Sequence, residues 1–136
     1  MLDYKNFKQD CKIIIEPFIE KYGFHMNFDK SEDYINYYSN NEVLIEVSML
    51  ENFPYIGVSL DFLTFNGKKI RRSILNQFLQ ISLKEESNSF NDFFLDKNVN
   101  DYSNQMRYSV FTMEKFYKPI LTGEVRLEDV IGKGSA

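Results

Sequence analysis

Hydrophobic residues recur at steps of three and four along residues 4–22, with polar residues between them. This spacing predicts an amphipathic helix with one apolar stripe. Asp3 suits the N-cap, and Gly23, followed by the apolar Phe24, suits the position just after the helix. Pro17 lies inside the pattern and removes one helical hydrogen bond, so we expect a kink there or two short helices end to end.

Four segments with a period of two follow, as expected of strands with one buried face. They span residues 24–29, 33–39, 42–50 and 55–65. Turn-forming residues separate them, and short connections make neighbouring strands antiparallel. The pattern therefore predicts a four-stranded meander.

Helical periodicity returns after Asn66-Gly67. It predicts a second helix over 69–83 and a third over 102–120, with a kink at Pro119. The intervening segment 84–97 is polar and acidic, and we interpret it as a loop with one packed turn. Leu127, Val130 and Ile131 predict a last turn.

The predicted fold class is therefore α+β, with an N-terminal helix, a four-stranded antiparallel meander, and two or three C-terminal helices packed on one sheet face. A length of 136 residues and an apolar content of 43% fit one domain. We expect this domain to span residues 1–131 and residues 132–136 to form a flexible tail.

Composition points to a cytoplasmic protein. Cys11 is the one cysteine, so no intramolecular disulfide can form, which fits a reducing compartment. The N-terminal residues mix both charges and lack the apolar core of a signal peptide. No apolar run approaches the roughly 20 residues of a membrane-spanning helix, so we expect no membrane partner.

The net charge of −4 is unevenly distributed. Residues 31–67 contain no lysine or arginine and six acids: Glu32, Asp33, Glu42, Glu46, Glu51 and Asp61. A nucleic-acid-binding protein needs a basic stripe, and this chain offers only the short run KKIRR at 68–72. The charge pattern therefore favours a cationic protein partner and no nucleic acid.

The alternation predicts a solvent-facing sheet surface rich in tyrosine and carboxylate. Its predicted members are Tyr34, Asn36, Tyr38, Glu46, Ser48, Tyr55, Ser59 and Asp61, with Glu42 and Glu51 near strand ends. One interpretation is that any exposed antiparallel face is polar. The other is a recognition surface, since tyrosines suit interface cores and carboxylates steer cationic partners. On this hypothesis the partner-binding residues are Tyr34, Tyr38, Glu42, Glu46, Tyr55 and Asp61.

No catalytic, cofactor or metal motif stands out. His25 is the only histidine, so the usual zinc sites and a hydrolase triad lack partners. Cys11 falls on the apolar stripe of the first helix and suits the core. Glu46 and Asp61 share a predicted sheet face, but an open face offers no desolvation to tune acid–base chemistry. We expect no enzyme activity and no cofactor.

Two further groups have alternative interpretations. The basic run 68–72 suits a solvated helix start, or a site for a phosphate or an acidic partner. Phe90, Phe93 and Phe94 suit cover for the edge of the core, whereas an exposed cluster would mark a contact site.

Several stretches resemble a known family: EPFIEKYGF (16–24), YINYYSNNEVLIEVSM (34–49), YIGVSLDF (55–62) and EKFYKPILTGE (114–124). Their layout is similar to small bacterial immunity proteins of polymorphic-toxin and contact-dependent inhibition systems. The resemblance covers most of the chain, through a helix that ends in Gly-Phe and a late aromatic helix. It implies a cytoplasmic protein that binds one cognate toxin or effector domain and blocks it, and it assigns no role to any single residue.

Two other functions remain open. A small acidic α+β chain also suits a dimeric chaperone or adaptor for a secreted effector. An enzyme or small-molecule-binding domain would need a concave polar pocket containing Glu46, Asp61 or His25.

Overall fold

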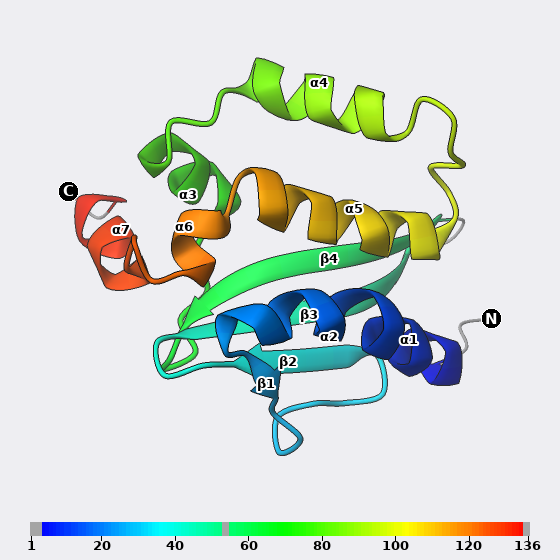
Figure 1. Cartoon of the computed structure of the whole chain (residues 1–136), viewed down its shortest axis with the longest axis horizontal. Helices are drawn as coiled ribbons and strands as arrows, with labels where there is room; N and C mark the ends of the chain where they lie inside the picture. The colour runs from blue at the N-terminus through cyan, green and yellow to red at the C-terminus, as the bar shows by residue number, and fades with distance from the viewer. Residues whose placement is uncertain (1–3, 53–54, 135–136) are drawn as a thin grey trace.

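The computed structural model describes residues 4–52 and 55–134, and it is an α+β fold (Figure 1). The chain begins with four consecutive helical segments: α1 (Tyr4–Asp10), the π-helix η1 (Cys11–Ile15), α2 (Glu16–Ile19) and the 3-10 helix η2 (Glu20–Tyr22). The predicted distortion near Pro17 takes the form of this π-helical turn, which widens the helix just before the residue that lacks an N–H. Gly23 ends the run at φ 81°, and Phe24 N–H donates to the carbonyl of Ile19 at 3.3 Å, which is the Schellman geometry that glycine favours.

The predicted meander is confirmed. Its strands are β1 (His25–Met26), β2 (Ile35–Ser39), β3 (Val43–Asn52) and β4 (Tyr55–Thr64). They pair antiparallel in the order β1-β2-β3-β4. The two long strands β3 and β4 supply most of the sheet, and β1 is a two-residue edge.

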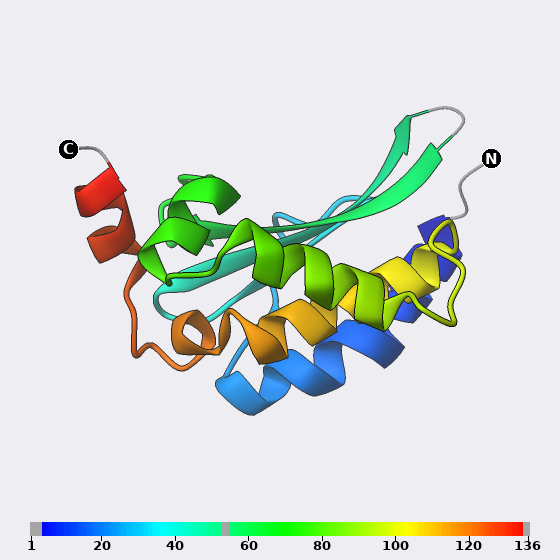
Figure 2. The ribbon, with the colours of Figure 1, turned by 90° about the horizontal axis from the view of Figure 1, so that it is seen from above.

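The helices lie on one face of this sheet, as predicted. Figures 1 and 2 place α1, α2, α5 (Tyr102–Lys115) and α6 (Lys118–Leu121) on the same side. Val43, Ile45 and Val47 of β3 face them and are buried, together with Leu60 and Phe62 of β4. The core also takes in apolar residues of the helices, including Phe7, Ile15, Ile19, Met106, Met113, Ile120 and Val130.

The predicted faces of β2 are wrong. Asn36 and Tyr38 were expected on the solvent side, but both are fully buried on the helix side, because they pair with Val47 and Ile45. Their polar atoms are satisfied there. Asn36 Nδ2 donates to the Tyr38 hydroxyl at 2.9 Å, and Asn36 Oδ1 accepts a hydrogen bond from Lys8 Nζ. The hydrogen-bonded network removes the cost that keeps an amide out of a core.

The C-terminal half is more helical than predicted. Its remaining helices are α3 (Arg72–Phe78), α4 (Leu83–Phe93) and α7 (Leu127–Gly134). The loop expected over 84–97 is wrong, because α4 occupies most of it. Ser82 and Glu85 form a capping box at its start, with Glu85 N–H donating to Ser82 Oγ at 3.0 Å. The predicted last turn is confirmed as α7, which includes residues 132–134 of the expected tail.

Candidate functional site

A polar row crosses the sheet face that is turned away from α1, α2 and α5. Tyr37 of β2 lies opposite Glu46 of β3, and Glu46 lies opposite Asp61 of β4. Directly opposite side chains of an antiparallel sheet share a face and contact one another. The predicted juxtaposition of the Glu46 and Asp61 carboxylates is therefore present.

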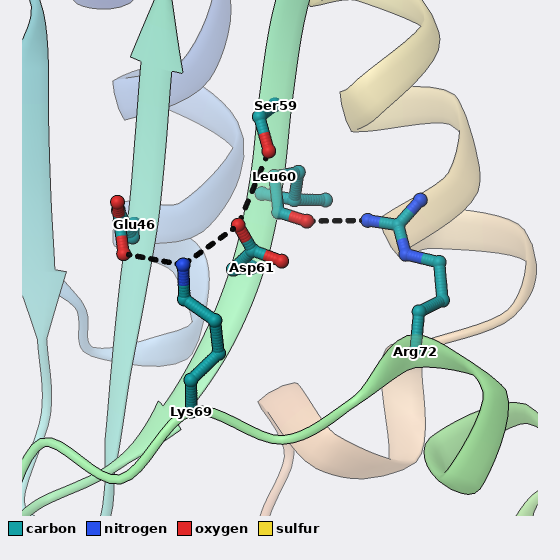
Figure 3. A network of polar contacts seen from close by, with 6 residues as sticks. All are labelled: Glu46, Ser59, Leu60, Asp61, Lys69 and Arg72. Atoms are coloured by element: carbon teal, nitrogen blue, oxygen red, sulfur yellow. Dashed lines mark hydrogen bonds and ion pairs between the residues drawn. The ribbon is translucent and has the colours of Figure 1, made fainter.

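Lys69 lies between these two carboxylates (Figure 3). Its Nζ is 3.6 Å from Glu46 Oε2 and 3.6 Å from Asp61 Oδ2. The Asp61 and Glu46 charges raise the pKa of Lys69, while partial burial opposes them. The three side chains together carry a net charge of about −1. Lys69 therefore neutralises about half of the negative charge of Glu46 and Asp61.

Backbone hydrogen bonds hold the segment that carries Lys69 against β4. Ile70 N–H donates to the Phe62 carbonyl at 3.1 Å, and Thr64 N–H donates to the Lys68 carbonyl at 2.9 Å. The chain therefore folds back on β4 after Gly67 before α3 begins. Sequence periodicity assigned Lys69 to the second helix and so missed this ion pair.

The six predicted partner-binding residues do not form one surface. Glu46 and Asp61 lie together, whereas Tyr34 is partly buried and packs against the core. Tyr38 is fully buried, and its hydroxyl donates to Glu16 Oε2 at 3.1 Å. Burial is the main reason why the pKa of Tyr38 is raised.

The other two predicted residues are Glu42 and Tyr55. Glu42 precedes β3 and lines a separate hollow of about 440 Å³ together with Tyr22 and Gly123. The backbone of Tyr55 begins β4, but its side chain lies outside the described part of the structure. Among the predicted surface residues whose side chains the structure describes, it therefore brings together Glu46 and Asp61.

Exposed apolar side chains gather in a different place, along α4 and the segment after it. Four of the seven large apolar side chains exposed in the described ranges come from residues 83–99: Leu83, Phe90, Leu95 and Val99. Leu83 is 82% exposed and Leu95 is 86% exposed. Leu83 and Phe90 are seven residues apart and so share one side of the helix.

Acidic side chains lie along a second side of α4. Glu85 and Asp92 are also seven residues apart and exposed, and Asp96 follows just beyond the helix. We call the set Leu83, Glu85, Phe90, Asp92 and Leu95 the α4 surface. The sequence carries its signal in the Ser82–Glu85 capping box, which places these residues on a helix instead of a loop.

Aromatic rings attach α4 to α5. Phe93 contacts Tyr108 and Phe111, with ring centroids 5.2 Å apart in both pairs. Phe94 lies 5.3 Å from Tyr108, and Phe90 meets the same ring edge-on at 5.5 Å. Phe93 and Phe94 therefore cover the core edge as predicted, whereas Phe90 remains partly exposed.

The residues weighed for catalysis are not brought together. His25 is exposed on β1. Cys11 is fully buried, and burial raises the pKa of its thiol to about 12, which opposes nucleophilic reactivity. Within residues 4–52 and 55–134, no three His, Cys, Asp or Glu residues are grouped so that they could hold a metal ion.

The helices described here are all too short or too polar to cross a membrane. Comparison with protein-family models, curated proteins and solved structures finds no match to this chain.

Proposed function

We propose that this protein is a non-enzymatic protein-binding module that acts in the cytoplasm as an immunity protein, binding a cognate bacterial toxin domain and neutralising it. The family resemblance of the sequence supports the toxin as partner. The observation that carries the binding function is the α4 surface, where exposed apolar side chains lie on one side of the helix and exposed acids lie on the other.

This surface has the composition of an interface. Contiguous exposed apolar side chains rimmed by polar groups are typical of protein-binding sites. Leu83, Phe90 and Leu95 supply apolar area that a partner can bury. Glu85 and Asp92, on the other side of the same helix, supply negative charge that favours association with a cationic partner.

The Glu46–Asp61 pair is a weaker binding site for the same partner. Lys69 lies 3.6 Å from both carboxylates, so a cationic partner would compete with an internal cation. We therefore place the principal contact on the α4 surface and not on the sheet face.

The first experiment is affinity capture of the tagged chain from cells of its own source, with identification by mass spectrometry. The expected product is one stoichiometric protein that carries a toxin domain. The purified toxin domain should bind one-to-one, and its activity should be blocked in the complex. Recovery of the chain alone as a dimer would contradict this function and favour the chaperone or adaptor.

Charge reversal then locates the interface. Glu85→Lys combined with Asp92→Lys should slow association with the toxin domain about tenfold at low salt. Glu124→Lys combined with Glu128→Lys is the matched control, because both are exposed acids outside the α4 surface. Slower association on reversal of Glu46 and Asp61, with no effect at α4, would move the interface to the sheet face.

A further inference from the structure

A groove runs between α4 and the rest of the molecule. One hollow of about 400 Å³ is lined by residues of α3, α4 and α5. A second hollow of about 340 Å³ extends it to Val58 and Leu60 of β4. The two hollows share four lining residues, Arg72, Phe90, Tyr108 and Thr112, so they adjoin, and we describe them together as the groove. Its size falls within the range of small-molecule sites.

Arg72 is the cation of this groove. It is the first residue of α3, and its side chain reaches β4, where Nη2 donates to the Leu60 carbonyl (Figure 3). Its guanidinium carbon lies 5.6 Å from the centroid of the Tyr117 ring. Among the described residues, no carboxylate lies within ion-pair distance of Arg72. A guanidinium has five N–H donors in a planar fork, so most of this fork is available to a ligand.

The groove walls are aromatic. Phe90, Tyr108, Phe116 and Tyr117 all line the hollow of about 400 Å³ beside Arg72. Phe90 and Tyr108 meet edge-on, with ring centroids 5.5 Å apart. Flat faces and edges of this kind pack favourably against another ring. Thr112 and Asn91 add polar groups at the same wall.

Glu86 restricts the charge that the groove accepts. Its carboxylate lines the same hollow and accepts a hydrogen bond from Asn76 Nδ2. Asn76 Oδ1 in turn accepts from the Tyr117 hydroxyl at 2.7 Å. Arg72 is the one cation among the residues that line the two hollows, so it neutralises one ligand charge, whereas the second charge of a dianion would face Glu86 without a partner. The groove therefore favours a single carboxylate over a phosphate monoester.

We propose that the groove under α4 binds a small aromatic monocarboxylate. Its carboxylate forms a bidentate pair with Arg72, and its ring packs against Phe90 and Tyr108. The Arg fork matches the planar geometry of a carboxylate, and charge-assisted pairs of this kind are the strong ones. The groove shares Phe90 with the α4 surface, but its residues all come from the free chain, so the proposal does not rest on the proposed toxin-binding function.

The test is an NMR titration of the ¹⁵N-labelled full chain with phenylacetate, its neutral isostere phenylacetamide, and phenyl phosphate. Phenylacetate should give saturable shifts of the amides of Phe90, Tyr108 and Thr112. It should bind about tenfold more tightly than phenylacetamide, because the charged pair is lost in the amide. Phenyl phosphate should bind more weakly than phenylacetate. Shifts without saturation, or equal affinity for the acid and the amide, would overturn the proposal.

Two variants and one control test whether Arg72 binds the carboxylate of the ligand. Arg72→Gln should remove the difference between acid and amide, and Arg72→Lys, which keeps the charge but loses the fork, should retain only part of it. Arg71→Gln is the matched control, because Arg71 is exposed, adjacent and outside the groove lining. Equal loss of phenylacetate affinity in Arg71→Gln would overturn the assignment. If Arg72→Gln fails to fold, undiminished selectivity in Arg72→Lys overturns the bidentate pair.

Discussion

The side-chain carbonyl of Gln105 accepts a hydrogen bond from the backbone N–H of Val58, with a distance of 2.9 Å from N to Oε1. Val58 lies on β4, which is an edge strand of the sheet. The Gln105 amide group also donates to the Val99 carbonyl at 2.9 Å. One side chain from α5 thus occupies the place where another strand would pair.

The rest of the edge is protected in the same way. Arg72 donates to the Leu60 carbonyl, and Ile70 N–H donates to the Phe62 carbonyl. Unpaired edge groups are templates for association with another chain. The Val58 N–H and the Leu60 and Phe62 carbonyls are therefore bonded within the chain and are not open to pairing with another strand.

We predict that Gln105→Ala opens this edge. The variant should lose about 1 kcal/mol of unfolding free energy, because the half-buried N–H of Val58 loses its partner, whereas the exposed Val99 carbonyl can bond to water. It should also self-associate with rising concentration in sedimentation velocity, whereas the wild-type chain should not. Gln77→Ala, at an exposed position of α3, is the control. A monomeric and equally stable Gln105→Ala would show that the edge needs no cap.

We predict that Lys69→Gln destabilises the fold by about 1 kcal/mol, because Glu46 and Asp61 then face each other without a cation. The Lys69 side chain is 54% exposed, whereas that of Glu46 is only 12% exposed. Solvent screening therefore limits the effect. Urea unfolding at low salt and at about 1 M NaCl measures it, and high salt should reduce the loss.

Lys68→Gln is the matched control for this prediction, since it removes the same charge from the neighbouring exposed residue. Lys69→Gln combined with Glu46→Gln should regain most of the lost stability. A double variant as unstable as the single one would indicate that Lys69 acts through packing and not through charge.

Strong periodicity made the sheet predictable. In β3 and β4 apolar residues alternate along most of each strand, and Ile45, Val47, Leu60 and Phe62 face the core as predicted. In β2, by contrast, tyrosine occurs at the adjacent positions 37 and 38, and tyrosine fits either face of a strand. The buried amide of Asn36 depends on Lys8 and Tyr38, and a partner 28 residues away is invisible to local alternation.

The polar composition of α4 led to the prediction of a loop in place of a helix. Residues 83–93 are rich in serine, asparagine and acids, which favour loops by propensity. The capping box and the contacts of Phe90, Phe93 and Phe94 with Tyr108 overcome that tendency. Because α4 was missed, the α4 surface and the groove were also missed. The ion pairs of Lys69 were not predicted because the chain extends along β4 before α3 starts, whereas the periodicity had placed Lys69 on a helix.

We predict that Ser82→Ala loosens α4. The capping box satisfies the N–H of Glu85, and its loss costs about 1 kcal/mol. Hydrogen exchange of the amides in 86–93 should accelerate about fivefold, with little change in the sheet. Ser87→Ala, at an exposed position inside the helix, should slow exchange, because alanine is the better helix former. Faster exchange in both variants would indicate that serine hydroxyls stabilise α4 without capping it.

We predict that the fold loses stability at alkaline pH. Burial raises the pKa of Cys11 from its ordinary value of 9.0 to about 12. Above pH 9 the unfolded chain therefore loses the thiol proton while the folded chain keeps it. Since the unfolded state then binds fewer protons, stability falls as pH rises, by about 1 kcal/mol between pH 9 and pH 10. This contribution is fully present below pH 9 and continues to be lost up to about pH 12.

Cys11→Ala should abolish most of this slope between pH 9 and pH 10. The variant leaves a small cavity, so its stability should be lower at pH 8 but nearly constant up to pH 10. Tyr38 and Tyr117, whose pKa values are also raised by burial, begin to contribute only above their ordinary value near 10. Urea unfolding at half-unit pH intervals separates the pH range of the thiol from the higher pH range of the tyrosines. An unchanged slope in Cys11→Ala would assign the alkaline loss to the buried tyrosines and not to the thiol.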